Sequence, residues 1–229
     1  MHDRSVLGPA DVSDEALAAM AADLLGLDPD RTTLLDSGAE VVAYDLDSIT
    51  TAGRYWVHGH VTAGNGALPF RMFVKHVQSW SRSPYFASVP VEFQAEAERS
   101  VPWRTEPLAY RSDLGDRLPA GLSMPRAVGV VDIDEKAGAV WLEEVPVAPV
   151  TWDVVRYARA ARLLGRLAAS PEVAELAGVG RHDFHVRDYL HGRLSMQVLP
   201  MLRDEDIWRH PLVAQHRDCL LYTSPSPRD

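Results

Sequence analysis

Phe70-Arg71-Met72-Phe73-Val74-Lys75-His76-Val77 is an apolar stretch around Lys75, the most informative residue of the chain. It predicts a β-strand, because its apolar members are large or β-branched. Side chains alternate faces along a strand, so Lys75 shares a face with Phe73 and Val77. A lysine held there is partly desolvated and needs an anion, for which a phosphate or a carboxylate would serve. The alternative is a lysine on a solvated strand face, where lysines are most often found.

Two further strands are predicted upstream of Lys75, at 40–45 and 54–61. The segment between them, 46–53, is short and rich in hydroxyl side chains. Gly64-Asn65-Gly66 contains an Asn-Gly pair, which is a strong hairpin signal. The three strands are therefore expected to form an antiparallel sheet.

Helices are expected both before and after these strands in the sequence. Residues 13–25 predict a first helix, with Ser13 as its N-cap and acids in its first turn. A second helix is expected across about 102–118. Its pattern is irregular, because Pro102 and Pro107 cannot both occupy a first turn.

A second hairpin is predicted from two apolar runs, 127–133 and 139–145, joined by a five-residue loop. Pro146 and Pro149 follow and mark the best candidate for a domain boundary. Beyond them, helices are predicted at 152–169, 172–178 and 183–202.

The predicted helix at 152–169 has Thr151 as a plausible N-cap and two distinct faces. Its expected buried stripe consists of Tyr157, Ala160, Ala161, Leu164, Leu167 and Ala168. The arginines of this helix lie largely on the other side, where a solvated face explains them better than a phosphate or nucleic-acid site.

Composition narrows the class of protein. The chain has 229 residues, 46% of them hydrophobic, which is enough for a sizeable core, and a formal net charge of −9. That charge argues against a nucleic-acid binder, and no apolar run reaches the roughly 18–20 residues of a membrane span. We expect a cytoplasmic protein without an internal disulfide, because Cys219 is the single cysteine.

The C-terminal residues 219–229 read as a translated sequencing adapter. The string CLLYTSPSPRD matches one reading frame of a common transposase adapter residue for residue. A natural Ser/Pro-rich tail is the alternative. Residues 219–229 are therefore expected to be no part of the fold, and genuine sequence is expected to end near Asp218, in mid-protein.

Several strings in this order resemble the aminoglycoside phosphotransferase group, whose members have a protein-kinase-like fold. The strings are TAGRY (51–55), FVK (73–75), WRTEPLAYRS (103–112), WLEEV (141–145) and RAARLLGRL (159–167). The resemblance implies an α+β, bilobal, kinase-like fold. Its parts would be an N-terminal helical segment (1–30), an antiparallel five-stranded N-lobe (31–146), an incomplete helical C-lobe (147–218) and the artefactual tail.

The resemblance also implies roles for two charged residues. In kinases a lysine on the third strand contacts the nucleotide phosphates, and a helix glutamate holds that lysine in place. Lys75 takes the first role and Glu106 the second, with Glu96 and Glu98 as rivals. Glu106 could instead be a solvated acid of a first helical turn.

Further nucleotide contacts are implied at two places. G-x-G-x-x-G is absent, so Ser48, Thr50, Thr51 and Gly53 are possible phosphate contacts, with an ordinary hairpin loop as the alternative. Backbone groups around Glu143, Glu144 and Val145 would meet the adenine edge. The two glutamate side chains are better read as surface acids.

The catalytic loop of the group, a His-Gly-Asp string, does not occur in this chain. His191-Gly192-Arg193 is the nearest string, and its third residue has the wrong charge. We therefore assign no catalytic or metal-binding residue. The expectation is a fragment of an ATP-dependent phosphotransferase that uses Mg²⁺ and acts on a small-molecule hydroxyl of an antibiotic, sugar or amino alcohol. The alternatives are a non-catalytic nucleotide-binding or interaction protein on the same scaffold, and a fragment that is not stable by itself; the oligomeric state is open.

Overall fold

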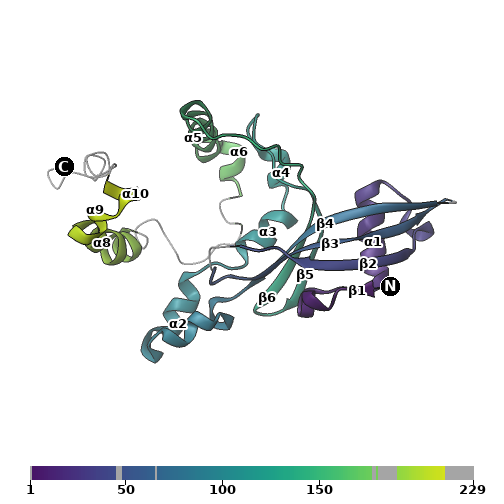
Figure 1. Cartoon of the computed structure of the whole chain (residues 1–229), viewed down its shortest axis with the longest axis horizontal. Helices are drawn as coiled ribbons and strands as arrows, with labels where there is room; N and C mark the ends of the chain where they lie inside the picture. The colour runs from purple at the N-terminus through teal and green to yellow at the C-terminus, as the bar shows by residue number, and fades with distance from the viewer. Residues whose placement is uncertain (1, 45–47, 65, 177–178, 180–189, 215–229) are drawn as a thin grey trace. The chain divides into compact units, whose positions relative to one another are not determined.

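The computed structural model describes residues 2–44, 48–64, 66–176, 179 and 190–214. The chain divides into two compact units, Met1–His182 and Asp183–Asp229. The first unit is mixed α+β and continues through Pro146 and Pro149, where a lobe boundary stays a prediction (Figure 1). In the described part of the chain, no helix is long and apolar enough to cross a membrane.

Six strands of the described chain form one sheet, in the order β1-β2-β3-β4-β6-β5. Their bounds are β1 (His2–Asp3), β2 (Leu34–Val41), β3 (Thr51–Ala63), β4 (Gly66–Gln78), β5 (Ala127–Asp134) and β6 (Ala137–Glu143). All neighbours are antiparallel except β1, which runs parallel to β2. The strand that contains Lys75 is β4, which lies between β3 and β6.

The predicted hairpin between β3 and β4 is confirmed. Ala63 pairs with Gly66 at the turn, and the register continues down both strands until Arg54 lies opposite Lys75. On its other side Lys75 lies opposite Val140 of β6.

Two strand boundaries and one loop were predicted wrongly. The strand expected at 40–45 is β2, Leu34–Val41, because residues from Leu34 onward pair with β3. β3 begins at Thr51 rather than at 54, so the last three residues of the hydroxyl-rich segment are strand. The loop between β5 and β6 has two residues and not five, since Asp134 already pairs with Ala137.

The first predicted helix is confirmed as α1 (Asp14–Leu25). Ser13 Oγ accepts a hydrogen bond from the backbone N–H of Ala16 at 3.2 Å, as an N-cap should. The helix ends at Gly26, whose φ of 68° lies in the left-handed region that glycine adopts without strain. α1 lies against the sheet (Figure 1).

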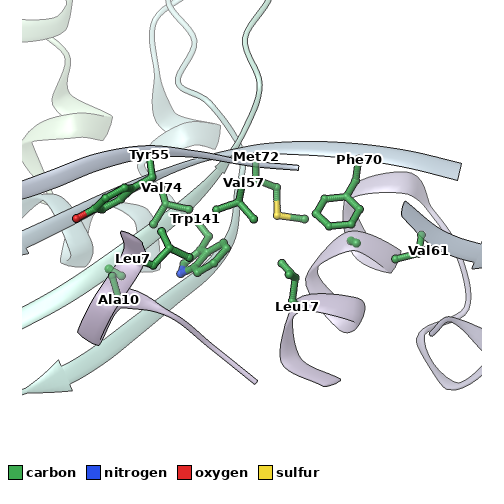
Figure 2. Close-up of a cluster of buried hydrophobic side chains, with 12 residues drawn as sticks. Leu7, Ala10, Leu17, Tyr55, Val57, Val61, Phe70, Met72, Val74 and Trp141 are labelled. Carbon is green, nitrogen blue, oxygen red and sulfur yellow. The ribbon is translucent and has the colours of Figure 1, made fainter. Parts of the chain in front are cut away.

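The hydrophobic core lies between one face of the sheet and the N-terminal segment, which comprises α1 and the 3₁₀ helix Ser5–Ala10 (Figure 2). Trp141 of β6 and Met72 and Val74 of β4 are fully buried there. The remaining members are Leu7, Ala10, Leu17, Ala21, Tyr55, Val57, Val61, Phe70 and Ala139. The N-terminal segment is therefore part of the core of the sheet.

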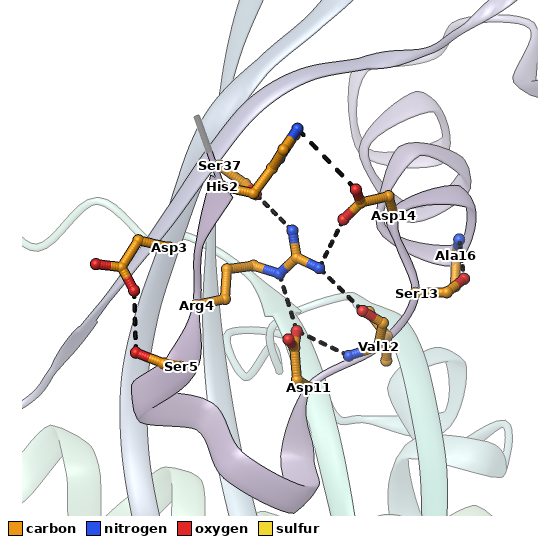
Figure 3. Close-up of polar contacts among 10 residues, drawn as sticks. All are labelled: His2, Asp3, Arg4, Ser5, Asp11, Val12, Ser13, Asp14, Ala16 and Ser37. Carbon is orange, nitrogen blue, oxygen red and sulfur yellow. Dashed lines mark hydrogen bonds and ion pairs between the residues drawn. The ribbon is translucent and has the colours of Figure 1, made fainter.

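A buried arginine fastens the N-terminal segment to the sheet (Figure 3). Arg4, 7% exposed, donates from Nε to Asp11 Oδ1 at 2.8 Å and from Nη2 to Asp14 Oδ1 at 2.8 Å. It also donates to Val12 O at 3.0 Å and to Ser37 Oγ of β2 at 2.5 Å. The hydrogen bond from Arg4 lowers the pKa of Asp14. The bonds to both strand and helix fix the segment in place.

The helix expected across 102–118 is wrong in its length. The structure has α3 (Thr105–Arg111) and α4 (Leu114–Arg117), separated by Ser112, whose ψ of 176° is extended. Pro107 is the third residue of α3, where its missing N–H removes no hydrogen bond within the helix. An additional helix, α2 (Val91–Ser100), was not predicted.

The helix expected at 152–169 is α5 (Val154–Ala168), with Asp153 and not Thr151 as its N-cap. Asp153 Oδ1 accepts from the backbone N–H of Arg156 at 2.8 Å. The predicted buried stripe is wrong, because none of its residues is buried, and Leu164 is 60% exposed. In the described chain, the helix expected at 172–178 is α6 (Pro171–Ala174), and 177–178 lie outside the described residues.

The second unit contains short helical elements. They are a π-helix (Leu190–Val198), α8 (Leu199–Arg203), α9 (Glu205–Arg209) and α10 (Pro211–Ala214). Trp208 is 5% exposed, and its Nε1 donates to Leu202 O at 2.7 Å. The predicted helix at 183–202 overlaps the first two elements, but 183–189 and the tail 219–229 lie outside the described residues.

Candidate functional site

Lys75 lies on the sheet face opposite the core. Met72 and Val74 point into the core, so the alternation along β4 places Phe73 and Lys75 on the other face. Lys75 Nζ donates to Glu106 Oε2 at 2.5 Å. The two side chains are 24% and 33% exposed, which leaves one side of the pair open to solvent or to a ligand.

Glu106 is the second residue of α3, and both ends of that helix are tied to the β5–β6 hairpin. Arg104 Nη2, just before α3, donates to Glu135 O at 2.6 Å. Arg111, at the end of α3, forms an ion pair with Asp132 at 2.8 Å. These contacts fix the helix along the sheet, and Glu106 is thereby held over β4.

Tyr110 lies one turn further along α3. Burial, and then the negative charge of Glu106, raises the pKa of the Tyr110 phenol. The phenol therefore stays protonated at neutral pH and remains a neutral neighbour of the Lys75–Glu106 pair.

The two rival acids lie on α2 and have other partners. Glu96 pairs with Arg99 at 2.5 Å on an exposed surface. Glu98 pairs with Lys136 at 2.8 Å and accepts from Ser79 Oγ and Ser81 Oγ at 2.7 and 2.6 Å. The hydrogen bond from Lys136 and, to a lesser extent, those from the two hydroxyls lower the pKa of Glu98 to about 2. Glu98 thus fastens α2 to the sheet.

Replacing Glu98 with glutamine is expected to destabilise the fold at neutral pH by about 1–2 kcal/mol. The effect stays moderate because the side chain is 32% exposed, so solvent screens its ion pair. A carboxylate with a depressed folded-state pKa contributes stability above its unfolded value of about 4.3, and this contribution is lost as pH falls toward 2. The deficit measured by urea unfolding should be largest at pH 7 and roughly halved at pH 3, because Glu98 with a pKa of about 2 is still mostly ionised in the folded protein at pH 3.

The matched control for this prediction is Glu96→Gln on the same helix. Its ion pair with Arg99 joins side chains that are 71% and 69% exposed. Such a surface pair contributes about 0–1 kcal/mol. Equal losses in the two variants would contradict the structural role of Glu98.

Aromatic and cationic side chains adjoin Lys75 on the same face. Trp56 of β3 and Phe73 of β4 meet edge to face with ring centroids 5.3 Å apart. The Arg71 guanidinium lies 4.1 Å from the centroid of the Trp56 ring. We call Trp56, Phe73 and Arg71 the Trp56 cluster. It places two aromatic rings and a guanidinium on the sheet face that carries Lys75, and it was not predicted.

The described part of the hydroxyl-rich segment, 48–53, contacts the end of β4. Thr50 O accepts from Gln78 N at 2.9 Å, and Thr51 pairs with Val77. Ser48 O accepts from Thr51 N at 3.4 Å. These backbone contacts align the segment with the end of β4.

Gly53 faces away from Lys75. It shares the core face of β3 with Tyr55, two residues on, and a Cβ at Gly53 would lie 2.1 Å from the Tyr55 hydroxyl oxygen. The structure therefore explains Gly53 by packing and does not place it on the face of Lys75.

The residues expected at the adenine edge follow the end of β6. Glu143 Oε1 accepts from Arg126 N at 2.7 Å, and Glu144 pairs with Arg71 at 2.5 Å. Both carboxylates have structural partners. Val145 is 48% exposed.

The arrangement of Lys75 and Glu106 suits an anion. An ammonium group oriented by one carboxylate can donate its remaining N–H groups to phosphate oxygens. Among the described residues, no group of three or more His, Cys, Asp or Glu side chains is placed to hold a metal ion.

Comparison with known proteins gives no relative for this site. No family model, no curated protein and no solved structure matches the chain.

Proposed function

We propose that this chain contributes the nucleotide-binding part of an ATP-dependent phosphotransferase that acts on a small-molecule hydroxyl. The observation that carries the proposal is the Lys75–Glu106 ion pair at 2.5 Å, on a sheet face that also presents aromatic rings. In this proposal the sheet is the N-lobe of a kinase-like bilobal fold, and α5 begins its helical C-lobe.

The order of the elements supports the proposal. From β2 onward the antiparallel strands follow the order β2-β3-β4-β6-β5. The lysine lies on the third of these strands along the chain, and the helix with the acid lies between the third and the fourth. This is the relation of lysine strand and glutamate helix that kinases use.

Each residue has a defined task in this proposal. Lys75 donates to phosphate oxygens of the nucleotide, and Glu106 orients the ammonium group. The Trp56 cluster provides apolar surface beside it, and the backbone around Val145 is the proposed contact for the adenine edge. Mg²⁺, when bound, neutralises phosphate charge, and we assign it no ligand among the described residues.

A non-catalytic nucleotide-binding protein is the second candidate. The feature that favours it is the lack of a His-Gly-Asp string in this sequence, in which His191-Gly192-Arg193 is the nearest string. Both candidates require nucleotide binding, and transfer of phosphate to an acceptor hydroxyl distinguishes them.

The test is a calorimetric titration of the chain with ATP, ADP and adenosine. ATP should bind saturably, and adenosine at least about tenfold more weakly, because it lacks the phosphates that Lys75 would contact. Equal affinity for ATP and adenosine would contradict the phosphate role of Lys75. No saturable binding of ATP would overturn the proposed function.

A further inference from the structure

A cavity of about 480 Å³ lies behind the helix that carries Glu106. One wall is formed by α3 and α4 and the other by α5 and α6, with Thr105, Ala109, Leu114, Leu167, Val173 and Leu176 among its lining residues. Its volume is within the range of small-molecule sites in proteins. We call it the α3 cavity.

Arg117 holds the two walls of the α3 cavity together. From α4 its Nη2 donates to Asp113 Oδ2 at 2.7 Å, and its Nη1 donates to Glu175 Oε2 at 2.5 Å, just after α6. Nη1 also reaches Glu172 O at 3.3 Å. The cavity therefore lies between elements that are linked to each other, rather than beside a single helix.

The lining chemistry selects the kind of ligand. All described lining residues are neutral, and most are apolar. A charged ligand would be desolvated there without a partner. The lining hydroxyls of Ser112 and Ser170 already donate, to Ala109 O at 2.7 Å and to Glu172 Oε2 at 3.3 Å.

Thr105 is the lining hydroxyl that still lacks a partner. Its Oγ1 is buried without a hydrogen bond in the described structure. A buried hydroxyl in this state favours a ligand that can donate to it or accept from it. Thr105 also precedes Glu106 directly, so a ligand held there contacts the first turn of α3.

We propose that the α3 cavity binds a small neutral molecule with an apolar body and one hydrogen-bonding group, held by Thr105 Oγ1. Its occupancy stabilises α3 in the position that pairs Glu106 with Lys75. The stabilisation of α3 rests on the proposed function, because it is measured through nucleotide affinity. The binding of a small neutral molecule in the α3 cavity does not depend on the proposed function.

The probe is 2-naphthol, a neutral aryl alcohol, titrated into the chain by calorimetry without nucleotide. One molecule should bind saturably per chain. Thr105→Val should weaken 2-naphthol about tenfold, as expected for one lost hydrogen bond, and leave the binding of naphthalene unchanged. Loss of both ligands together in a folded variant would overturn the role of Thr105.

A substitution that fills the α3 cavity tests whether 2-naphthol binds there. Ala168→Phe places a ring among the lining residues and should abolish 2-naphthol binding. Ala158 lies on the same helix, nine residues before the lining residue Leu167, so the two side chains point to opposite sides of the helix. Ala158→Phe should therefore bind 2-naphthol as the unmodified chain does. No saturable binding to the unmodified chain, or equal binding to both variants, would overturn the site.

The coupling to Lys75 is measured in a second titration, with ATP in the presence of saturating 2-naphthol. ATP affinity should rise about three- to tenfold, within the usual range of coupling between sites. Unchanged ATP affinity would overturn the coupling but leave the assignment of the α3 cavity as a binding site intact. If ATP does not bind at all but 2-naphthol does, the proposed function fails and the cavity assignment stands.

Discussion

Replacing Lys75 with methionine is expected to weaken ATP binding at least about 30-fold, the equivalent of about 2 kcal/mol. Methionine keeps much of the length of the side chain but loses the charge. The Glu106 carboxylate, which is 33% exposed, would then face the nucleotide phosphates without its partner. Loss of attraction and new repulsion act in the same direction. Calorimetric titration of both proteins with ATP measures the difference.

Lys136→Met is the matched control for this experiment. Lys136 also donates to a glutamate on a helix, Glu98 at 2.8 Å, but it lies in the β5–β6 turn. Its loss should reduce stability slightly and leave ATP affinity within about twofold, because it has no place beside the nucleotide. An ATP affinity that survives Lys75→Met in a folded protein removes Lys75 from the site.

Truncating Trp141 to alanine is expected to destabilise the first unit by about 3–5 kcal/mol, a large share of the stability of a domain. The side chain is 0% exposed and packs in the core beside Leu7 and Val74. Alanine leaves a cavity. The β-strands on both sides of β6 cannot move in to fill it without losing their register. Urea unfolding followed by far-ultraviolet circular dichroism measures the loss.

The conservative change Trp141→Phe should cost much less, under about 2 kcal/mol. Trp141 Nε1 is buried without a hydrogen-bond partner in the described structure. Phenylalanine removes this unsatisfied donor, which offsets part of the lost packing. A loss as large as that of the alanine variant would contradict this offset.

The sequence predicts the centre of the fold well because strand pairing follows from one turn. Counting equal numbers of residues outward from the Ala63–Gly66 closure places Arg54 opposite Lys75 and Trp56 opposite Phe73, as the structure has them. The Trp56 cluster could therefore have been found by this count. The choice of Glu106 needed the resemblance, since short helices broken by proline have weak periodicity.

The features that the sequence did not predict depend on contacts between distant segments. The core position of Leu7 and the bonds of Arg4 to Ser37 join residues about thirty positions apart. The apolar side of α5 predicts burial, yet Leu164 is exposed. Periodicity tells which side of a helix is apolar, but not what covers that side.

The buried guanidinium of Arg4 has a practical consequence for handling the protein. Residues 2–12 cannot be treated as an expendable leader, because they fill part of the core and lie along one edge of the sheet. Trimming them for expression would open the β2 edge to pairing with other chains and would favour aggregation.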